Sequence, residues 1–453
     1  MTHILQRNVN VTPPVAATAS GMMIQTADGR TIIDGSGGAA VACLGHGNRR
    51  VRAAILAQLD AIAYAHTSFF TSAPAEELAD LLVGHVPGGL SHAFFLSGGS
   101  EAMEAAIKLT RQYFLECGEP RRTRFIARRQ GYHGNTLGAL AASGSPARAN
   151  RYGPLLSDAF SFVSPAFAYR HQLANESEAA YVQRLADELE AEFQRLGPAN
   201  VAAVCAETVI GATCGAVPAP AGYFRALRAI CDRHGALLIL DEVMCGMGRT
   251  GTMHAWEQEG VFPDIQTIAK GLGAGYQPIA AILVQGRIVQ AISNGSGSLM
   301  HGHTYSGHPV ACAAALAVQR VIAEDDLLAN IGVMGARLRE RLHDRFGQHA
   351  HVGDIRGRGL FMAIELVEDR PAKTPFASAL KLHARIRNAA LERGLACYAL
   401  GGTVDGAAGD HVLLAPPYIA TAQDIDRIVD ILGDAVDASL LALPGAAMPR
   451  ETQ

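Results

Sequence analysis

The stretch Ala236-Leu237-Leu238-Ile239-Leu240-Asp241-Glu242 consists of five apolar residues followed by two acidic ones. A second run, Asp264-Ile265-Gln266-Thr267-Ile268-Ala269-Lys270, ends in a lysine and leads into a glycine-rich turn at 271–275. Short apolar runs bounded in this way predict buried strands of a parallel sheet. Open α/β sheets bind ligands at the carboxyl ends of their strands, so we expect Asp241 and Lys270 at one such edge.

Lysine is rare in this chain, which makes Lys270 unusual. Only four lysines, at positions 108, 270, 373 and 381, occur among 453 residues, and arginine supplies most of the positive charge. A lysine amine can lose its proton and form a Schiff base with a carbonyl group, whereas a guanidinium cannot. A lysine at a strand end is more often a solvated charge, but its position near Asp241 suggests a carbonyl-binding lysine paired with an aspartate that binds a cofactor.

The order of the predicted elements indicates an α/β fold. Strand-like and helix-like segments alternate from about residue 55 to about residue 325, as in a mainly parallel sheet between helices. After residue 325, charged amphipathic helices flank short strands, which suggests a smaller α+β domain. We therefore expect residues 56–325 to form a large domain, and residues 1–55 to join 326–453 in the small one. The clearest predicted strands are 92–96, 124–127, 201–205 and 359–366, and the clearest helices begin at 101 and span 223–234.

Composition limits the classes of function. The chain has 49% hydrophobic and 18% charged residues, which fits a compact globular protein. A net charge of -4 gives no electrostatic attraction for nucleic acid or for an anionic membrane. The N-terminal residues 1–7 lack the apolar region of a signal peptide, and no apolar run is long enough to span a bilayer. We therefore expect a cytoplasmic protein without nucleic-acid or membrane partners.

The eight cysteines are scattered through apolar segments without a C-x-x-C pair. This distribution favours small buried side chains over disulfides or metal ligands. Three histidines at positions 301, 303 and 308 stand close together, but no acidic partner or metal-binding spacing accompanies them. We expect no metal site.

Two glycine-containing turns have properties that suit a phosphorylated aromatic ligand. Ser97-Gly98-Gly99-Ser100-Glu101-Ala102 connects a predicted strand to a predicted helix, and a helix N-terminus has unpaired N–H groups that suit a phosphate. An ordinary strand-to-helix turn explains this segment equally well. Gly131-Tyr132-His133-Gly134 places an aromatic ring after another predicted strand, where it can stack on a planar group or simply pack in a loop. A carboxylate such as Asp241 can keep a ring nitrogen protonated.

The segment Gly246-Met247-Gly248-Arg249-Thr250-Gly251 matches the G-x-G-x-x-G pattern of dinucleotide-binding proteins. However, two acidic residues separate these glycines from the preceding strand, and no clean helix follows them. The pattern therefore gives little support to a dehydrogenase.

Taken together, these motifs resemble the class III aminotransferases, which are pyridoxal-phosphate enzymes of fold type I. The resemblance covers nearly the whole chain. It includes residues 240–251, Pro263-Asp264 and Ala269-Lys270-Gly271-Leu272-Gly273, with Met247 where phenylalanine is common. Four further blocks agree in their order along the chain: 97–102, 132–134, 304–309 and 414–417.

The resemblance implies roles for individual residues. Lys270 would hold pyridoxal 5'-phosphate as an aldimine and move a proton during a ping-pong reaction, and Asp241 would keep the pyridinium nitrogen charged. Tyr132 and Val243 would contact the two ring faces, and Thr304 would reach the phosphate of the neighbouring subunit. The further implied cofactor contacts are Gly99, Ser100, His133 and Glu207. The family resemblance also implies a homodimer with shared active sites, or a tetramer.

One departure from the family concerns the substrate. Relatives that use ornithine, acetylornithine or 4-aminobutyrate have an arginine where this chain has Leu413. Ala40 stands where some amine-using relatives have a bulky aromatic residue, and Phe69 and Phe70 lie near the substrate in the family layout. These four positions favour an amine or ω-amino acid donor and pyruvate as the 2-oxo acid acceptor, unless Arg128, Arg129 or Arg151 binds a second carboxylate.

Other functions stay open from the sequence alone. The same fold and cofactor support an aminomutase, a decarboxylase, a racemase or a 2-oxoglutarate-dependent aminotransferase of diamines or diamino acids. The sequence names neither the donor nor its stereochemistry.

Overall fold

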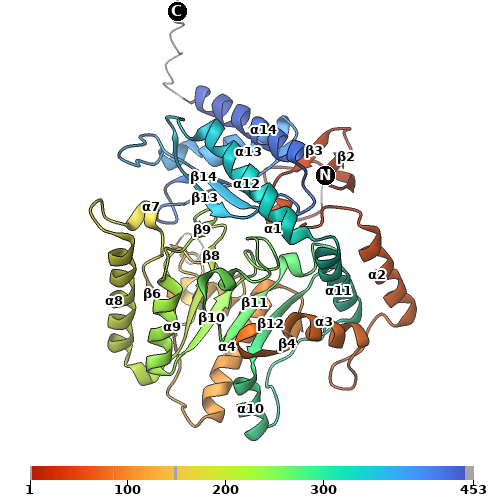
Figure 1. Ribbon diagram of the computed structural model, residues 1–453, viewed down its shortest axis with the longest axis vertical. Coiled ribbons are helices and arrows are strands. Elements are labelled where there is room, and N and C mark those ends of the chain that lie inside the picture. Colours follow the sequence, from red (N-terminus) through yellow and green to blue (C-terminus); the bar gives the residue numbers. More distant parts are fainter. Residues whose placement is uncertain (1–2, 85, 147–149, 444–453) are drawn as a thin grey trace, which may run out of the picture.

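A computed structural model describes residues 3–84, 86–146 and 150–443. A large sheet with helices on both faces forms one part of the molecule, and a smaller part with two further sheets lies above it (Figure 1). The outermost residues of the predicted ranges 1–55 and 326–453 lie outside the described residues, as does the start of the N-terminal segment that lacks a signal-peptide pattern.

The large sheet has seven strands in the order β4-β12-β11-β10-β7-β5-β6. Strand β12 is antiparallel to both of its neighbours, and the remaining pairs are parallel. The mainly parallel α/β fold expected from the sequence is therefore confirmed. The strands span Leu90–Leu96 (β4), Arg124–Arg128 (β5), Phe160–Val163 (β6), Val201–Glu207 (β7), Leu237–Asp241 (β10), Ile265–Ile268 (β11) and Ala280–Gln285 (β12).

The central strands are apolar because both of their faces are covered. Along β10, Leu238 and Leu240 pack into one apolar cluster, whereas Leu237 and Ile239 pack into another on the opposite face. This division follows from the two-residue period of a strand. Helices α3 (Ala73–Val83), α8 (Glu178–Leu196), α9 (Tyr223–His234) and α11 (Pro309–Glu324) cover the first face, and α4 (Gly99–Glu116), α5 (Leu137–Ala142) and α10 (Gly286–Asn294) cover the second.

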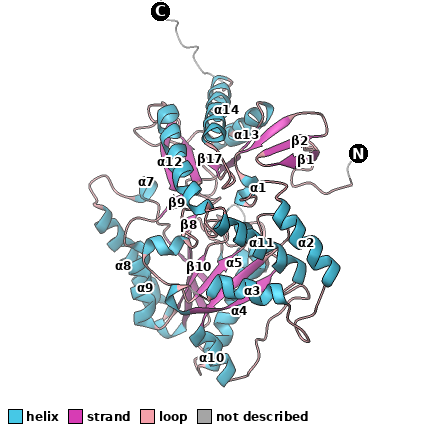
Figure 2. Cartoon of the chain, turned by 45° about the vertical axis from the view of Figure 1, so that its right-hand side comes forward, coloured by secondary structure: helices cyan, strands magenta, loops and turns pink. Residues whose placement is uncertain are grey.

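The small part combines the N-terminal strands with the C-terminal third of the chain (Figure 2). One sheet has the order β1-β2-β3-β15, and β15 pairs with β3 in parallel across more than 350 positions of sequence. The other sheet is antiparallel, with the order β13-β14-β17-β16. The strands span Ala16–Ser20 (β1), Met23–Thr26 (β2), Thr31–Asp34 (β3), Val352–Arg358 (β13), Phe361–Leu366 (β14), Leu395–Ala396 (β15), Tyr398–Gly401 (β16) and Asp410–Leu414 (β17).

Helices of the small part share a core with these sheets and with α11. The boundaries proposed from the sequence at residues 55 and 325 stay predictions, although the pairing of β3 with β15 agrees with a shared small domain. The helices of this part span Gly37–Ala40 (α1), Arg49–Ala61 (α2), Leu327–Phe346 (α12), Leu382–Glu392 (α13) and Ala422–Leu441 (α14). The short helix Ala168–His171 (α7) packs against the core of the large part. Short 3-10 turns occur at Pro87–Gly89, Gly153–Leu155, Pro198–Asn200, Ala255–Glu259, Lys270–Leu272 and Ser378–Leu380, and a two-stranded sheet pairs Val209–Ile210 (β8) with Val217–Pro218 (β9).

One predicted element ends earlier than expected. Strand β11 stops at Ile268, and Lys270 begins a 3-10 turn with a φ of 39°. Positive φ is uncommon for residues other than glycine and marks a strained backbone that its surroundings must hold. The turn directs the chain across the end of the sheet, where the ligand-binding edge of an open α/β fold lies.

Candidate active site

Three ionisable side chains gather at the carboxyl ends of neighbouring strands. Asp241 ends β10, Glu207 ends β7, and the two residues are register partners in the sheet. Asp241 is also the register partner of Thr267 on β11, three residues before Lys270. Parallel pairing thus brings together the aspartate and the lysine singled out in the sequence.

The environment of Lys270 favours the neutral amine. Burial lowers the pKa of Lys270 below its usual value, and the nearby carboxylates of Asp241 and Glu207 oppose this shift. A neutral amine is the form that attacks a carbonyl carbon. Burial of Lys270 therefore supports covalent chemistry at its Nζ atom.

Hydrogen bonds from three elements fix the Asp241 carboxylate. Its Oδ1 accepts from the backbone N–H of Val243 and from the Thr267 hydroxyl, both at 3.0 Å. Its Oδ2 is 2.7 Å from Nδ1 of His133, and both side chains are buried. His133 therefore helps to fix the orientation of the carboxylate.

Helix α4 begins at the cavity without a side-chain cap. Gly98 is the N-cap residue and makes no side-chain capping bond. A Cβ on Gly99 would lie 2.8 Å from a methyl group of Val243, so only glycine allows this close approach. The Ser100 hydroxyl accepts a hydrogen bond from the Asn135 N–H at 3.0 Å. Bare N–H groups and a hydroxyl at a helix N-terminus fit a phosphate.

Glu207 organises the opposite wall. Its Oε1 accepts from the Tyr132 N–H at 3.0 Å, and its Oε2 accepts from the Gly211 N–H at 2.8 Å. Burial raises the pKa of Glu207, partly offset by His133 and by the hydrogen bond from Gly211. Through these hydrogen bonds, Glu207 holds the loop that contains Tyr132 and the loop that contains Gly211.

A cavity of about 500 Å³ opens between these groups. A volume of this size suits a cofactor together with a small substrate. Eight of the site residues inferred from the sequence line it: Gly99, Ser100, Tyr132, His133, Glu207, Asp241, Val243 and Lys270.

Five inferred residues do not line this cavity. Phe69 and Phe70 are 78% and 68% exposed, and Thr304 is also exposed, on a surface away from it. Ala40 and Leu413 are buried in a small apolar cluster that includes the lining residues Val209, Ala212, Met244 and Tyr398. Ala40 and Leu413 thus lie behind the cavity wall, so neither position is in contact with the open space.

The structure adds residues that the sequence analysis did not identify. Arg7, from the segment before β1, lines the cavity, as do Tyr398 of β16 and Gln277. The first two come from the small part of the molecule and no local motif marks them. Only knowledge of which distant segments of the chain lie together could have identified these residues.

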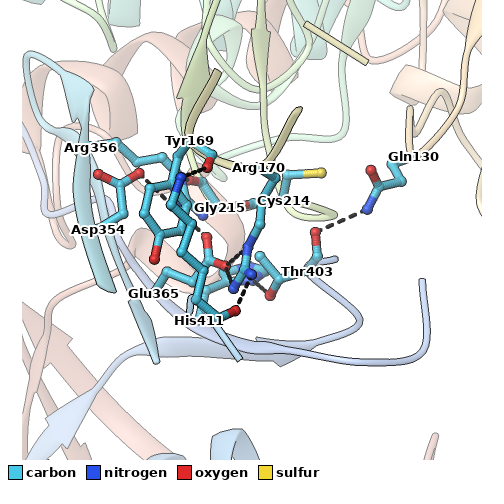
Figure 3. Close-up of polar contacts among 11 residues, drawn as sticks. Gln130, Tyr169, Arg170, Cys214, Gly215, Asp354, Arg356, Glu365, Thr403 and His411 are labelled. Carbon is cyan, nitrogen blue, oxygen red and sulfur yellow. Dashed lines mark hydrogen bonds and ion pairs between the residues drawn. The ribbon is translucent and has the colours of Figure 1, made fainter. Parts of the chain in front are cut away.

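A buried ionic cluster holds the loop at residues 214–215 (Figure 3). Arg356 of β13 donates to the Gly215 carbonyl at 2.8 Å and to the Cys214 carbonyl. The same guanidinium pairs with Glu365 of β14 at 2.6 Å, and Glu365 also accepts from Arg170 at 2.6 Å. The small part thereby holds in place the loop that contains the lining residue Ala212.

The glycine pattern at 246–251 forms turns rather than a strand-to-helix junction. Arg249 within it is buried, donates to the carbonyls of Leu360 and Pro416 at 3.1 and 2.6 Å, and stacks on Tyr418. It is therefore a structural connection between the two parts of the molecule. Within the described ranges, no cluster of three His, Cys, Asp or Glu side chains could hold a metal ion, and no helix is long and apolar enough to cross a bilayer.

Comparison with known proteins agrees with this site. A family model described as aminotransferase class-III matches residues 4–436. The chain belongs to the class-III aminotransferases. It is 47% identical over 443 residues to an aminotransferase of Schizosaccharomyces pombe. The aligned residues cover 98% of this chain and 96% of the relative.

Two further relatives have names that state their substrates. A taurine–pyruvate aminotransferase of Rhodobacter capsulatus is 36% identical, covering 95% of this chain and 92% of the relative. A diaminobutyrate–2-oxoglutarate transaminase of Halomonas elongata is 34% identical, covering 92% and 88%.

Solved structures show the same fold over the same length. An (S)-enantioselective omega-transaminase from Thermomicrobium roseum superposes with a TM-score of 0.90 at 35% identity, covering 97% of this chain and 96% of the other. The omega-transaminase of Pseudomonas jessenii in complex with PMP gives the same TM-score at 34% identity, covering 97% and 96%. The protein is a fold type I aminotransferase whose cofactor is pyridoxal 5'-phosphate.

The residues of the cavity fit this cofactor. Lys270 supplies an amine of lowered pKa, Asp241 a fixed carboxylate, and the α4 N-terminus free N–H groups. Gly99 allows the backbone of this turn to lie against Val243, where a Cβ would clash.

Proposed function

We propose that this aminotransferase moves an amino group from an amine or ω-amino acid to a 2-oxo acid, with pyruvate favoured, by a ping-pong mechanism. The observation that carries the proposal is the cavity in which the Lys270 amine, with its lowered pKa, lies close to the Asp241 carboxylate. In such a reaction the donor leaves as an oxo compound before the acceptor binds, so a single cavity serves both half-reactions.

The chain's own residues divide the work. Pyridoxal phosphate supplies an electron sink when it is bound. Lys270 would hold the cofactor and move a proton at its Nζ atom. Asp241 would stabilise a positive charge on the ring nitrogen, and His133 would orient that carboxylate. Val243 and Tyr132 would confine the ring, while Gly99 and Ser100 at the α4 N-terminus would bind the phosphate.

The preference for a monocarboxylate acceptor rests on the cavity's charges. Leu413 is buried and apolar, so this position provides no cation for a second carboxylate. The lining also includes apolar side chains such as Val41, Met244 and Ile279, which suit an apolar donor. The taurine–pyruvate relative uses pyruvate by its name, and the diaminobutyrate relative uses 2-oxoglutarate, so both acceptors must be tested.

The deciding experiment is a panel of amines and ω-amino acids, each assayed with pyruvate and with 2-oxoglutarate. We expect the donor alone to convert the cofactor absorbance to that of the pyridoxamine form, and pyruvate to restore it. A tenfold or greater preference for 2-oxoglutarate, about 1.4 kcal/mol in transition-state energy, would contradict the proposed acceptor. Turnover of a single amino acid without an oxo acid would indicate the alternative aminomutase, decarboxylase or racemase.

Lys270→Ala is the first matched variant. We expect it to lose turnover and the cofactor linkage that borohydride reduces, because no other amine lines the cavity among the described residues. Lys381→Ala, at the start of α13, is the control and should keep both properties. Retention of a reducible linkage in Lys270→Ala would refute the role given to this lysine.

We also propose a homodimer with shared active sites, which can assemble further into a tetramer. Tyr64, Phe69, Phe70 and Tyr305 form an exposed group that we call the aromatic surface. The rings of Tyr64 and Tyr305 are 5.9 Å apart, and the Tyr64 hydroxyl donates to the Thr304 carbonyl at 2.7 Å. Exposed apolar patches of this kind mark protein interfaces. Covering this surface with a second copy would bring Thr304 to the neighbour's site.

A cytoplasmic location is part of the proposal. All eight cysteines are free, and Cys117 is exposed. Free thiols persist in reducing compartments. Cell fractionation with a tagged chain tests this location.

A further inference from the structure

The cavity contains one guanidinium that no step of the proposed reaction uses. Among the described residues, Arg7 is the single arginine in the lining. The other basic lysine or arginine side chain there is Lys270, to which we assign the cofactor. The two lining carboxylates, Asp241 and Glu207, already accept hydrogen bonds from protein donors. Arg7 therefore supplies the positive charge that stays available for a ligand.

The arginines suggested by the sequence cannot take this role in the observed arrangement. Arg128 is buried, donates to the Glu207 carbonyl, and stacks near the rings of Tyr223 and Phe224. Arg129 pairs with Glu188 at 2.6 Å on the surface. Arg151 is exposed and does not line the cavity.

Arg7 is accessible and has no anionic partner. Its side chain is exposed, and none of the ion pairs among the described residues includes it. Most other arginines near the cavity, such as Arg249 and Arg356, are held by carbonyls or carboxylates. A planar guanidinium with free N–H groups can bind both oxygens of a carboxylate at once.

We propose that Arg7 forms the subsite for the carboxylate of the 2-oxo acid acceptor. The proposal rests on the proposed transamination and names its recognition element. One guanidinium satisfies one carboxylate, so the subsite fits a small monocarboxylate and leaves the second carboxylate of a diacid without a partner. The N-terminal segment thereby determines acceptor specificity from outside the sheet that holds the cofactor.

The test compares Arg7→Met with Arg7→Lys in the holoenzyme. Arg7→Met keeps much of the apolar stem and removes the charge, and we expect kcat/KM for pyruvate to fall by about tenfold to a hundredfold, the usual range for a lost charged hydrogen bond. Arg7→Lys should lie between this variant and the wild type. Arg427→Met, an exposed arginine of α14 far from the lining residues, is the control and should leave the kinetics unchanged.

Two further measurements separate recognition from a structural role. The donor half-reaction with 1-phenylethylamine, which has no carboxylate, should proceed at the wild-type rate in Arg7→Met. Calorimetric titration of the holoenzyme with propionate, an unreactive monocarboxylate, should show weaker binding by the same factor as the kinetic loss.

The outcomes are distinguishable. Unchanged propionate affinity in Arg7→Met would overturn the subsite, whatever substrates the enzyme uses. Equal slowing of both half-reactions would also overturn it, because that pattern indicates a structural defect. If pyruvate proves to be no acceptor at all, the proposed function fails, and the propionate titration still decides whether Arg7 binds a carboxylate.

Discussion

Asp241 shows how much protein is needed to hold one functional carboxylate. Its two oxygens receive hydrogen bonds from Val243, Thr267 and His133, which belong to the loop after β10, to β11 and to the loop after β5. All of these partners lie at the carboxyl edge of the sheet. The geometry of the aspartate is therefore set by parallel pairing as well as by its immediate neighbours.

Asp241→Asn should retain the cofactor and lose most activity. A neutral amide cannot keep a ring nitrogen protonated, and an opposite charge of this kind contributes about 1–3 pKa units to its partner. Activity and cofactor absorbance of the purified variant measure both properties. Asp80→Asn, at an exposed position of α3, is the matched control. Unchanged turnover with full cofactor occupancy in Asp241→Asn would contradict this assignment.

Elements meet at buried charges between the two parts of the molecule. Arg170 of α7 and Arg356 of β13 both pair with Glu365 of β14, and all three side chains are at most 7% exposed. Arg356 also donates to the carbonyls of residues 214 and 215, which connects this ionic cluster to the loop at the cavity wall.

Glu365→Gln should lower the free energy of unfolding by about 3–5 kcal/mol, because it leaves the buried Arg170 guanidinium without a counter-charge and Arg356 with Asp354 alone. Glu77→Gln breaks an exposed pair with Arg320 and should cost about 0–1 kcal/mol. Urea unfolding of both variants measures the contrast. Similar losses in the two variants would show that the buried cluster contributes no more than a surface pair.

Strand β17 carries a histidine that makes stability depend on pH. Burial, with repulsion from Arg356 and His383, lowers the pKa of His411 to about 3, and the Thr403 hydroxyl bonds its Nδ1 at 2.7 Å. Between about pH 6.5 and pH 3 the unfolded chain binds a proton that the folded chain rejects. Stability is therefore full above pH 6.5 and falls on acidification, by at most about 1.4 kcal/mol per pH unit.

His411→Gln should reduce this dependence. The variant is less stable at pH 7.5 because the Thr403 contact changes, but its urea midpoint should fall less between pH 7.5 and pH 5 than that of the wild type. His254, whose pKa burial lowers to about 4, retains part of the slope. His92→Gln, at an exposed position, should leave the wild-type slope intact. An unaltered slope in His411→Gln would exclude this residue as its source.

The sequence predicted elements well where local signals mark their ends. The helix expected over 223–234 occurs as Tyr223–His234, bounded by Gly222 and Gly235 in left-handed conformations. The sequence predicted the end of β11 two residues too late. Lys270 adopts a positive φ, and because it is not a glycine, the sequence gives no sign that the turn begins here. Motif residues in the strand-end loops line the cavity as expected. Arg7 and Tyr398 also line it, but they are far from these motifs in the sequence.

At the scale of the whole molecule, the aromatic surface predicts the assembly. Introducing carboxylates with Phe69→Glu and Phe70→Glu should split the proposed homodimer into monomers, since charges in an apolar interface lose their hydration. Sedimentation velocity measures the state. Val333→Glu places the same charge at a 63% exposed position of α12 and should leave the dimer intact. A double variant that stays dimeric would move the interface elsewhere.

If each active site contains residues of both subunits, two impaired variants should restore activity when they form a mixed dimer. If Thr304 of the partner subunit binds the phosphate at each site, Thr304→Val weakens cofactor binding and Lys270→Ala removes catalysis, so each homodimer is impaired. A mixed dimer of the two variants contains one site with its own Lys270 and an intact Thr304 from the other chain. Co-expressed, differently tagged chains should therefore recover up to about half of the wild-type activity per dimer at limiting cofactor. No recovery in the purified mixed dimer would mean that Thr304 acts within its own chain. Wild-type activity of the Thr304→Val homodimer at limiting cofactor would mean that Thr304 does not act at all.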